Sequence, residues 1–198
     1  MLPTGTIGTP YIWIPNSKSG TLAQLSTKNG TLVNLYQNED GSAGKFPTDA
    51  FSTLNGGISR ITVIPGGDVY VANRGNQYVI RLKPTGLPSG EYEYGGRLDM
   101  GTGETYIRAV TFDKKGYVWA GTNGSASGVD KLKVFCASNT TDPNCVGNSF
   151  DKQLAVFPGK AHYGAISDKY GFVWTVNGEI RSYSYSSGTI TEVSTGSV

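Results

Sequence analysis

Four residues of the sequence have side chains that could together recognise a ligand. Arg60, Arg108 and Tyr163 occupy equivalent positions in three repeated segments, each near the start of a predicted strand. His162 directly precedes Tyr163. If these strands lie side by side, two guanidinium groups, an imidazole and a phenol would meet and could hold an anionic or sugar-like ligand. In an alternative that the sequence favours, the two arginines pair with nearby carboxylates or carbonyls and only fill the space between the strands.

Catalytic chemistry has a thinner basis in the sequence. His162 is the only histidine, so one chain cannot supply a two-histidine site. A single histidine can act in general acid–base catalysis, but no motif places a glutamate beside it. Glu179 belongs to a different strand of the same repeat, and Glu104 precedes the third repeat. We therefore predict no catalytic residues, no metal site and no cofactor, and we expect a protein that is not an enzyme.

Three aspartates, Asp68, Asp113 and Asp168, lie in predicted hairpin turns beside glycines. Loops that combine Asp and Gly can bind Ca²⁺, but these stretches lack the alternating carboxylates of calcium-binding loops. Aspartate side chains also accept hydrogen bonds from nearby backbone N–H groups and so form turns. We predict this structural role for all three.

The two cysteines, Cys136 and Cys145, bracket a stretch of loop-forming residues. Nothing nearby could complete a metal site or activate a thiolate, so we predict a disulfide; two unpaired thiols in a cytosolic protein are the alternative. A disulfide favours an oxidising compartment, and we expect an extracellular or periplasmic location. Asn29, Asn123 and Asn139 begin possible N-glycosylation sequons that fit this location, although chance supplies some sequons in a chain this rich in Gly, Ser and Thr.

Composition excludes several kinds of partner. Charged residues make up 16% of the chain and the formal net charge is +2. Lys and Arg are scattered, whereas a nucleic-acid-binding surface needs clustered cations, so we expect no nucleic-acid partner. No apolar run approaches the ~18 residues of a membrane-spanning helix, so we expect no membrane span. Residues 1–5 do not begin a secretory signal peptide, which means that a signal has been removed or that the chain is part of a longer protein.

A strand–turn–strand pattern recurs four times along the chain. The two clearest copies are FDKKGYVWAGTN (112–123) and ISDKYGFVWTVN (166–177); residues 64–73 form a looser copy, and residues 11–16 retain only its second half. Each copy has a large aromatic residue on a predicted strand, at 11–15, 69–73, 117–122 and 172–175. These anchor aromatics are Trp13, Tyr70, Trp119 and Trp174.

Repeats of about 50 residues that hold four short antiparallel strands are typical of β-propeller blades. We therefore predict an all-β fold, a single β-propeller domain over residues 1–198 with approximate blades at 4–56, 57–103, 104–160 and 161–198. One such sheet cannot bury both of its faces, so blades must stack on one another. The anchor aromatics are suited to fill the gaps between blades.

The repeats also resemble a known family. The motif VYVANR (69–74), with Ser59 and Arg60 preceding it, resembles the repeats of streptogramin lyase-like (virginiamycin B lyase-like) propellers. Residues 107–110 leading into 113–119, and residues 163–166 leading into 171–174, resemble them too. The Asp-x-x-Gly-x-x-Trp core is also similar to NHL repeats and to the sensor propellers of two-component regulators. The resemblance covers roughly residues 11–194 and implies the fold; the metal-dependent lyases of this family use histidine and glutamate, a pattern that a chain with one histidine does not match.

The number of repeats departs from these families, whose propellers normally have about six to eight blades. This chain has four anchors, and its first repeat lacks an obvious innermost strand unless residues 4–9 form it. The chain could form a closed four-bladed ring, part of a larger propeller completed by other sequence, or an open stack in an assembly. We expect the closed ring, with an incomplete first blade.

These observations favour an extracellular, non-enzymatic propeller that acts as a binding or structural interaction module, in a surface or filamentous assembly. Its partner would be a protein or a glycan, and other copies of the same chain are candidates. Two alternatives stay open. One is a metal-dependent lyase-like enzyme with its site at the channel mouth, and the other is an extracellular sensor propeller of a signalling protein.

Overall fold

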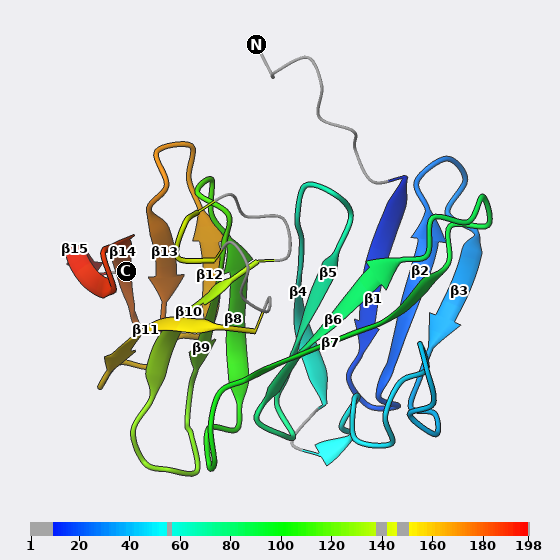
Figure 1. The fold of residues 1–198 in the computed structure, drawn as a ribbon. Helices are drawn as coiled ribbons and strands as arrows, with labels where there is room; N and C mark the ends of the chain where they lie inside the picture. The colour runs from blue at the N-terminus through cyan, green and yellow to red at the C-terminus, as the bar shows by residue number, and fades with distance from the viewer. Residues whose placement is uncertain (1–9, 55–56, 138–141, 146–150, 198) are drawn as a thin grey trace.

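The computed structural model describes residues 10–54, 57–137, 142–145 and 151–197 (Figure 1). The described residues form fifteen β-strands in four antiparallel sheets, which confirms the all-β prediction. We number the sheets as blades in chain order. Blade 1 contains β1 (Tyr11–Asn16), β2 (Thr21–Ser26) and β3 (Leu32–Tyr36). Blade 2 contains β4 (Ile58–Val63), β5 (Val69–Asn73), β6 (Tyr78–Pro84) and β7 (Tyr92–Asp99). Blade 3 contains β8 (Ile107–Phe112), β9 (Tyr117–Thr122), β10 (Lys131–Cys136) and β11 (Gln153–Pro158). Blade 4 contains β12 (Gly164–Ser167), β13 (Val173–Val176), β14 (Glu179–Ser186) and β15 (Thr189–Ser197).

The blades pack on one another in chain order. Within each blade the strands pair in sequence order, as in a meander. The first strands of blades 2, 3 and 4 (β4, β8 and β12) lie side by side and form the inner edge of the array. The array therefore has the blade arrangement of a propeller.

Among the described residues, blade 1 has three strands and no innermost strand before β1, in line with the incomplete first repeat of the sequence. The end of β1 contacts the start of β4, where the Ser17 hydroxyl donates a hydrogen bond to the Ile58 carbonyl at 2.5 Å. The end of β5 meets the start of blade 3 in the same way, through a bond from the Tyr106 N–H to the Arg74 carbonyl. β1 therefore corresponds to the second strand of the other blades. Residues 4–9, the candidate for the missing strand, lie outside the described residues.

Within the described residues, the four blades do not form the closed ring that we expected from the sequence. Blade 1 and blade 4 lie at opposite ends of an open arc (Figure 1). In the described part of the chain, β1 packs on β4, but it does not pack on β12 as neighbouring inner strands do. Apolar side chains on the outward faces of both end blades stay exposed, among them Ile12 and Ile166. The rotation from one blade to the next, taken three times, thus does not bring blade 4 next to blade 1.

Anchor aromatics fill the three gaps between blades, as predicted. Trp13 packs with Leu22, Tyr36 and Ile58 between blades 1 and 2. The second and third gaps hold Tyr70 and Trp119, and both side chains are fully buried. Trp174, the fourth anchor, points to the outward face of blade 4 and is only partly buried.

Turn aspartates hold the two complete Asp-x-x-Gly-x-x-Trp motifs together. The Asp113 carboxylate accepts the indole N–H of Trp119 at 2.7 Å and the backbone N–H groups of Lys115 and Tyr117. Asp168 accepts the indole N–H of Trp174 at 2.9 Å in the same way. These bonds confirm the predicted turn role of Asp113 and Asp168. The Asp68 carboxylate accepts the guanidinium of Arg81 at 2.6 Å. The buried Trp13 indole nitrogen has no such partner within the described residues, which include no strand and turn before β1.

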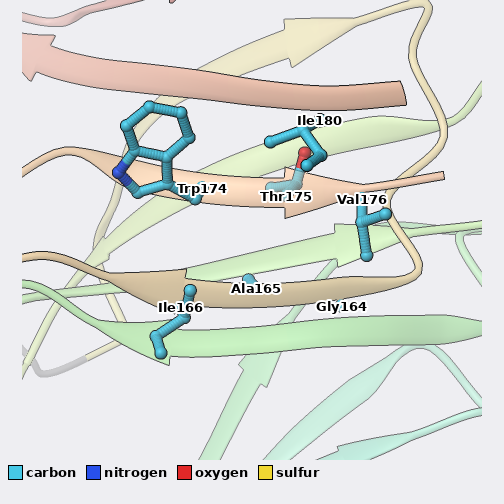
Figure 2. A pocket seen from close by; sticks show the side chains of 7 residues that line it. All are labelled: Gly164, Ala165, Ile166, Trp174, Thr175, Val176 and Ile180. Atoms are coloured by element: carbon cyan, nitrogen blue, oxygen red, sulfur yellow. The ribbon is translucent and has the colours of Figure 1, made fainter. Parts of the chain in front are cut away.

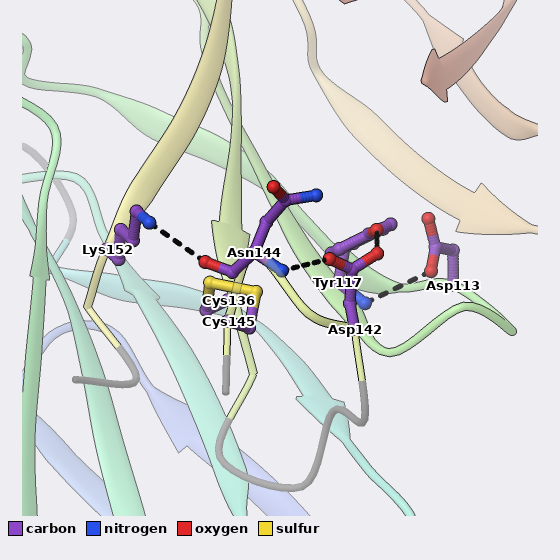
Figure 3. The surroundings of a disulfide bond; sticks show 7 residues. All are labelled: Asp113, Tyr117, Cys136, Asp142, Asn144, Cys145 and Lys152. Carbon is purple, nitrogen blue, oxygen red and sulfur yellow. Dashed lines mark hydrogen bonds between the residues drawn. A yellow bond between two sulfur atoms is a disulfide. The ribbon is translucent and has the colours of Figure 1, made fainter. Parts of the chain in front are cut away.

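Cys136 and Cys145 form the predicted disulfide (Figure 3). Both cysteines are buried against the gap between blades 3 and 4. The Asp142 carboxylate accepts the phenol of Tyr117, and the Lys152 ammonium donates to the Asn144 carbonyl at 2.9 Å. The disulfide and these hydrogen bonds fasten the described end of the cysteine loop to the outer edge of blade 3.

The long polar segment between β3 and β4 contributes more to the core than its composition indicated. Phe46, Ala50 and Phe51 are buried in the cluster between blades 1 and 2. The side chain of Asn38 accepts the backbone N–H of Phe51 at 2.7 Å and donates to its carbonyl at 2.9 Å. Isolated aromatics without a period gave no sign of this packing in the sequence.

His162 lies in the gap between blades 3 and 4. Its side chain is fully buried, its Nδ1 is 3.1 Å from the Thr175 hydroxyl, and its ring packs edge-on against Tyr183. Gly121 makes this packing possible, since a Cβ there would come within 2.7 Å of the His162 Cβ. Burial, with a smaller contribution from the positive charge of Arg181, lowers the pKa of His162 to about 4. The imidazole is therefore neutral at pH 7.

The first prediction concerns the buried carboxylate of Asp113. In Asp113→Ala, a buried indole N–H and two backbone N–H groups lose their acceptor, which should lower the free energy of unfolding by about 2–4 kcal/mol. Urea denaturation measures the loss. The control is Asp99→Ala, which removes an exposed turn carboxylate that accepts the Gly101 N–H and should cost under about 1 kcal/mol. Equal losses in the two variants would contradict the assigned role.

The second prediction follows from the lowered pKa of His162. The unfolded chain binds a proton near the ordinary pKa of 6.5, whereas the folded chain binds it only near about 4. Stability from the neutral buried ring is therefore fully present above pH 6.5 and is lost as the pH falls from 6.5 towards 4. At pH 4.5 the free energy of unfolding should be lower by about 2–3 kcal/mol because of this group. Denaturant titrations at pH 7.5 and 4.5 should show a smaller difference for His162→Gln than for the unmodified protein; identical differences would be evidence against this linkage.

Candidate ligand-binding site

The structure brings together three of the four predicted site residues. Arg60 lies on β4, Arg108 lies on β8, and Tyr163 directly precedes β12. The guanidinium carbon of Arg60 is 5.2 Å from the centre of the Tyr163 ring, and that of Arg108 is 5.1 Å from it. Because β4, β8 and β12 are neighbours, these side chains form one cluster at the end of the inner strands where each strand begins. We call it the arginine–tyrosine cluster.

The predicted equivalence of Arg60 and Arg108 is off by one position. β4 and β8 each contain an irregularity in pairing, so that Ser59 and Arg108 have no opposite partner. Arg108 therefore corresponds to Ser59, whereas Arg60 corresponds to Ala109. The long arginine side chain still reaches Tyr163 from the shifted position. The sequence alignment could not show this shift, because a bulge leaves no signal in residue type.

Two further residues belong to the cluster. The guanidinium carbon of Arg108 is 5.8 Å from the centre of the Tyr106 ring. Burial, followed by the nearby charges of Arg108 and Arg60, lowers the pKa of Arg74, so three positive charges lie close together. In the sequence, Arg74 is the last residue of the repeat motif VYVANR, and no pattern of residue types distinguishes Tyr106.

Tyr106 also has an unusual backbone. Its φ is 60°, in the left-handed region that residues other than glycine rarely adopt. Its N–H donates to the Arg74 carbonyl, and its carbonyl accepts the Asn123 N–H, each at 3.1 Å. The first bond links the strand ends of blades 2 and 3, the second joins the ends of β8 and β9 within blade 3, and together they hold Tyr106 beside Arg108. Backbone conformations of this kind concentrate at functional sites.

The charges of Arg60 and Arg108 are not paired with carboxylates within the described residues. Every ion pair found there involves other cations than Arg60 and Arg108. Arg60 donates to the Ser59 carbonyl at 3.1 Å. The buried Nε of Arg108 has no hydrogen-bond partner in the part of the chain that the structure describes. Carboxylate pairing, one form of the structural alternative, therefore has no support there.

His162 is not part of this cluster. Its imidazole lies in the gap between blades 3 and 4, in contact with Thr175 and Tyr183. Because His162 is fully buried, it has no exposed nitrogen that could contact a ligand beside Tyr163. The two glutamates weighed as its partners are paired elsewhere. Glu104 accepts the ammonium of Lys131, and Glu179 accepts the guanidinium of Arg181.

Two of the three sequons lie in described segments. Asn29 is exposed in the turn between β2 and β3, where its side chain accepts the Thr31 N–H. Asn123 donates to the Asn177 side chain at 3.0 Å and is only partly exposed. Asn139 lies outside the described residues.

Two searches of the described residues gave negative results. No group of three or more His, Cys, Asp or Glu side chains is placed there to hold a metal ion. No helix within the same residues is long and apolar enough to cross a membrane.

Sequence comparison and structure comparison give different amounts of information. No protein-family model matches the sequence, and no curated protein sequence matches it. Solved structures do match. A protein from Lactobacillus plantarum aligns over 95% of this chain with a TM-score of 0.65 and 18% identity. A streptogramin B lyase aligns over 92% with a TM-score of 0.56 and 13% identity. Virginiamycin B lyase from Staphylococcus aureus aligns over 94% with a TM-score of 0.56 and 14% identity.

The matches cover only part of each neighbour. This chain spans 54%, 50% and 53% of these three structures, or about half of their length. At such low identity the likeness concerns the fold alone. The resemblance to streptogramin lyase-like propellers stated from the repeats is therefore supported at the level of architecture: the chain has the fold of consecutive β-propeller blades.

Proposed function

We propose that this protein is a non-enzymatic propeller module that binds an anionic group at the arginine–tyrosine cluster. The observation that carries the proposal is that the guanidinium carbons of Arg60 and Arg108 lie 5.2 Å and 5.1 Å from the centre of the Tyr163 ring, with no carboxylate paired to either arginine among the described residues. Clustered guanidinium groups repel one another: burial is the largest cause of the lowered pKa of Arg74, and the charges of Arg108 and Arg60 lower it further. A bound anion would relieve this repulsion, which supports a ligand rather than a purely structural role.

The chemistry of the cluster favours an acidic glycan as the ligand. Guanidinium groups bind carboxylate or sulfate groups through paired N–H donors. Tyr163 is 43% exposed, so its ring can lie against the apolar face of a sugar while its hydroxyl reaches water. An acidic segment of a protein partner offers the same carboxylates without the sugar ring. The glycan therefore uses more of the cluster.

The proposed setting is outside the cytoplasm, as part of a surface assembly. The disulfide between Cys136 and Cys145 supports an oxidising compartment. The exposed sequon at Asn29 is compatible with it. Both arguments are independent of the arginine–tyrosine cluster.

Lyase activity is not part of the proposal. Two lyases among the structural neighbours are 13% and 14% identical to this chain. Identity this low supports a shared fold but not a shared activity. The only histidine of the sequence is buried and neutral, away from the surface. A metal-dependent cleavage of a streptogramin-type lactone that disappears in His162→Ala would overturn this view.

The third prediction tests the arginine–tyrosine cluster. A heparin-derived oligosaccharide should bind to the protein, and a neutral glucose oligosaccharide of equal length should not. The double variant Arg60→Ala with Arg108→Ala should lose at least about tenfold in affinity, because a hydrogen bond to a charged group is worth about 1.5–3 kcal/mol. Isothermal titration calorimetry at two salt concentrations measures affinity and its screening by salt.

The control for this experiment is another arginine–tyrosine pair. The guanidinium carbon of Arg97 lies 3.7 Å from the centre of the Tyr78 ring. This guanidinium is already paired with the Asp49 carboxylate, with 3.0 Å between Nη1 and Oδ2. Arg97→Ala should leave the affinity unchanged. An unaltered affinity in the double variant, an equal loss in Arg97→Ala, or no binding of the anionic oligosaccharide would each contradict the proposal.

A further inference from the structure

We propose that the two exposed ends of the blade array bind each other between two copies of this chain, so that two half-rings close into one propeller. This inference is independent of ligand binding at the arginine–tyrosine cluster. It rests on the two outward sheet faces, on their equivalence to buried faces inside the array, and on the length of the structural neighbours.

The outward face of blade 1 is aliphatic. Ile12 pairs across the sheet with Leu25, and Ile14 pairs with Ala23, so these side chains form two adjacent rows on one face. β3 extends both rows, through Leu32 and Leu35. Ile12 is 50% exposed and Ile14 is 46% exposed. We call this surface end face 1.

The repeats show what covers such a face. Ile12 is one residue before its anchor aromatic, as are Val69, Val118 and Val173 in the other blades. All three valines are fully buried, each in the gap towards the preceding blade. End face 1 is therefore a blade-to-blade surface without a preceding blade in this chain.

The outward face of blade 4 is also apolar. Trp174, Val176, Ile166 and Ile180 line a groove of about 370 Å³ on this face (Figure 2). Ile166 is 68% exposed and Val176 is 40% exposed. We call this surface end face 4.

End face 4 is equivalent to surfaces that are covered elsewhere. Its anchor, Trp174, corresponds to Trp119 and Tyr70, which are fully buried against the following blade. In this chain no blade follows within the described residues. The groove is thus the place where the first strands of a next blade would pack.

The two end faces are complementary in kind, because one requires a preceding blade and the other requires a following blade. They lie at opposite ends of the arc (Figure 1). End face 4 of one copy can therefore receive end face 1 of a second copy, and a twofold axis repeats the contact on the other side. Large exposed apolar surfaces of this kind mark interaction sites.

The structural neighbours are about twice as long as the segment that this chain matches. This chain spans 54%, 50% and 53% of three solved structures that share its fold. A second copy would supply a segment of the same size, with both required faces. We therefore assign a second copy as the occupant rather than a small ligand or a single added strand.

The fourth prediction is the mass in solution. Sedimentation equilibrium of the 198-residue chain at micromolar concentration should give twice the 21.0 kDa of one copy. A monomer would overturn the proposal. A mass that keeps rising with concentration would also overturn it, because head-to-tail contacts that do not close produce filaments.

A mixing experiment tests which faces meet. Ile14→Asp places a charge on end face 1, and Val176→Asp places a charge on end face 4. In the proposed ring, each variant alone loses both contacts and should sediment as a monomer. An equimolar mixture retains one intact contact, between end face 4 of the Ile14→Asp chain and end face 1 of the Val176→Asp chain. The mixture should therefore form dimers that neither variant forms alone.

This recovery also separates loss of contact from loss of folding, since unfolded variants would not recover on mixing. The matched control is Val156→Asp on β11, which changes a valine that is 39% exposed and lies away from both end faces. It should stay dimeric. Dimers of either end-face variant alone, or a mixture that stays monomeric while both variants are folded by circular dichroism, would overturn the proposed pairing.

Discussion

An antiparallel sheet with apolar side chains on both faces is stable only when another layer covers each face, and this requirement determines how the protein is built. Each interior blade meets it by packing between two neighbours. The anchor aromatic of one blade fills the gap, and aliphatic residues of the next blade pack against this aromatic. Tyr70 of blade 2 and Val118 of blade 3 are an example. The turn aspartates, the order of the blades and the exposed end faces all follow from this one arrangement.

The polar features occur where the packing leaves space for them. Inner strands are close enough that Arg60 and Arg108 reach a single tyrosine from two different blades. The tight gap between blades 3 and 4 instead encloses His162 and keeps it neutral. Two neighbouring residues of the sequence, His162 and Tyr163, thus have different environments: the imidazole is fully buried, whereas the phenol is 43% exposed beside the two arginines.

Much of the fold was predictable from the sequence, because it depends on local signals that repeat. The anchor aromatics, the aspartate turns and the disulfide each leave a pattern of residue types at fixed spacing. Three features left none: the irregular pairing before Arg60, the packing of Phe46 and Phe51, and the openness of the array. Closure depends on the angle between successive blades, which is set by the shapes of many packed side chains together. The candidate site was half predictable for the same reason, since the sequence placed Arg60, Arg108 and Tyr163 together but could not tell that His162 turns inward.

The open arc also affects how the chain loses structure. An array of stacked sheets behaves nearly as a one-dimensional system, in which each unit is stabilised by its neighbours. Blades 2 and 3 pack against neighbours on both sides, whereas blades 1 and 4 of a single copy do so on one side only among the residues that the structure describes. Local opening should therefore cost least in the terminal sheets, so that their backbone amides exchange with deuterium before those of β5 and β9. Any contact that covered the ends would remove this gradient and make exchange uniform along the array.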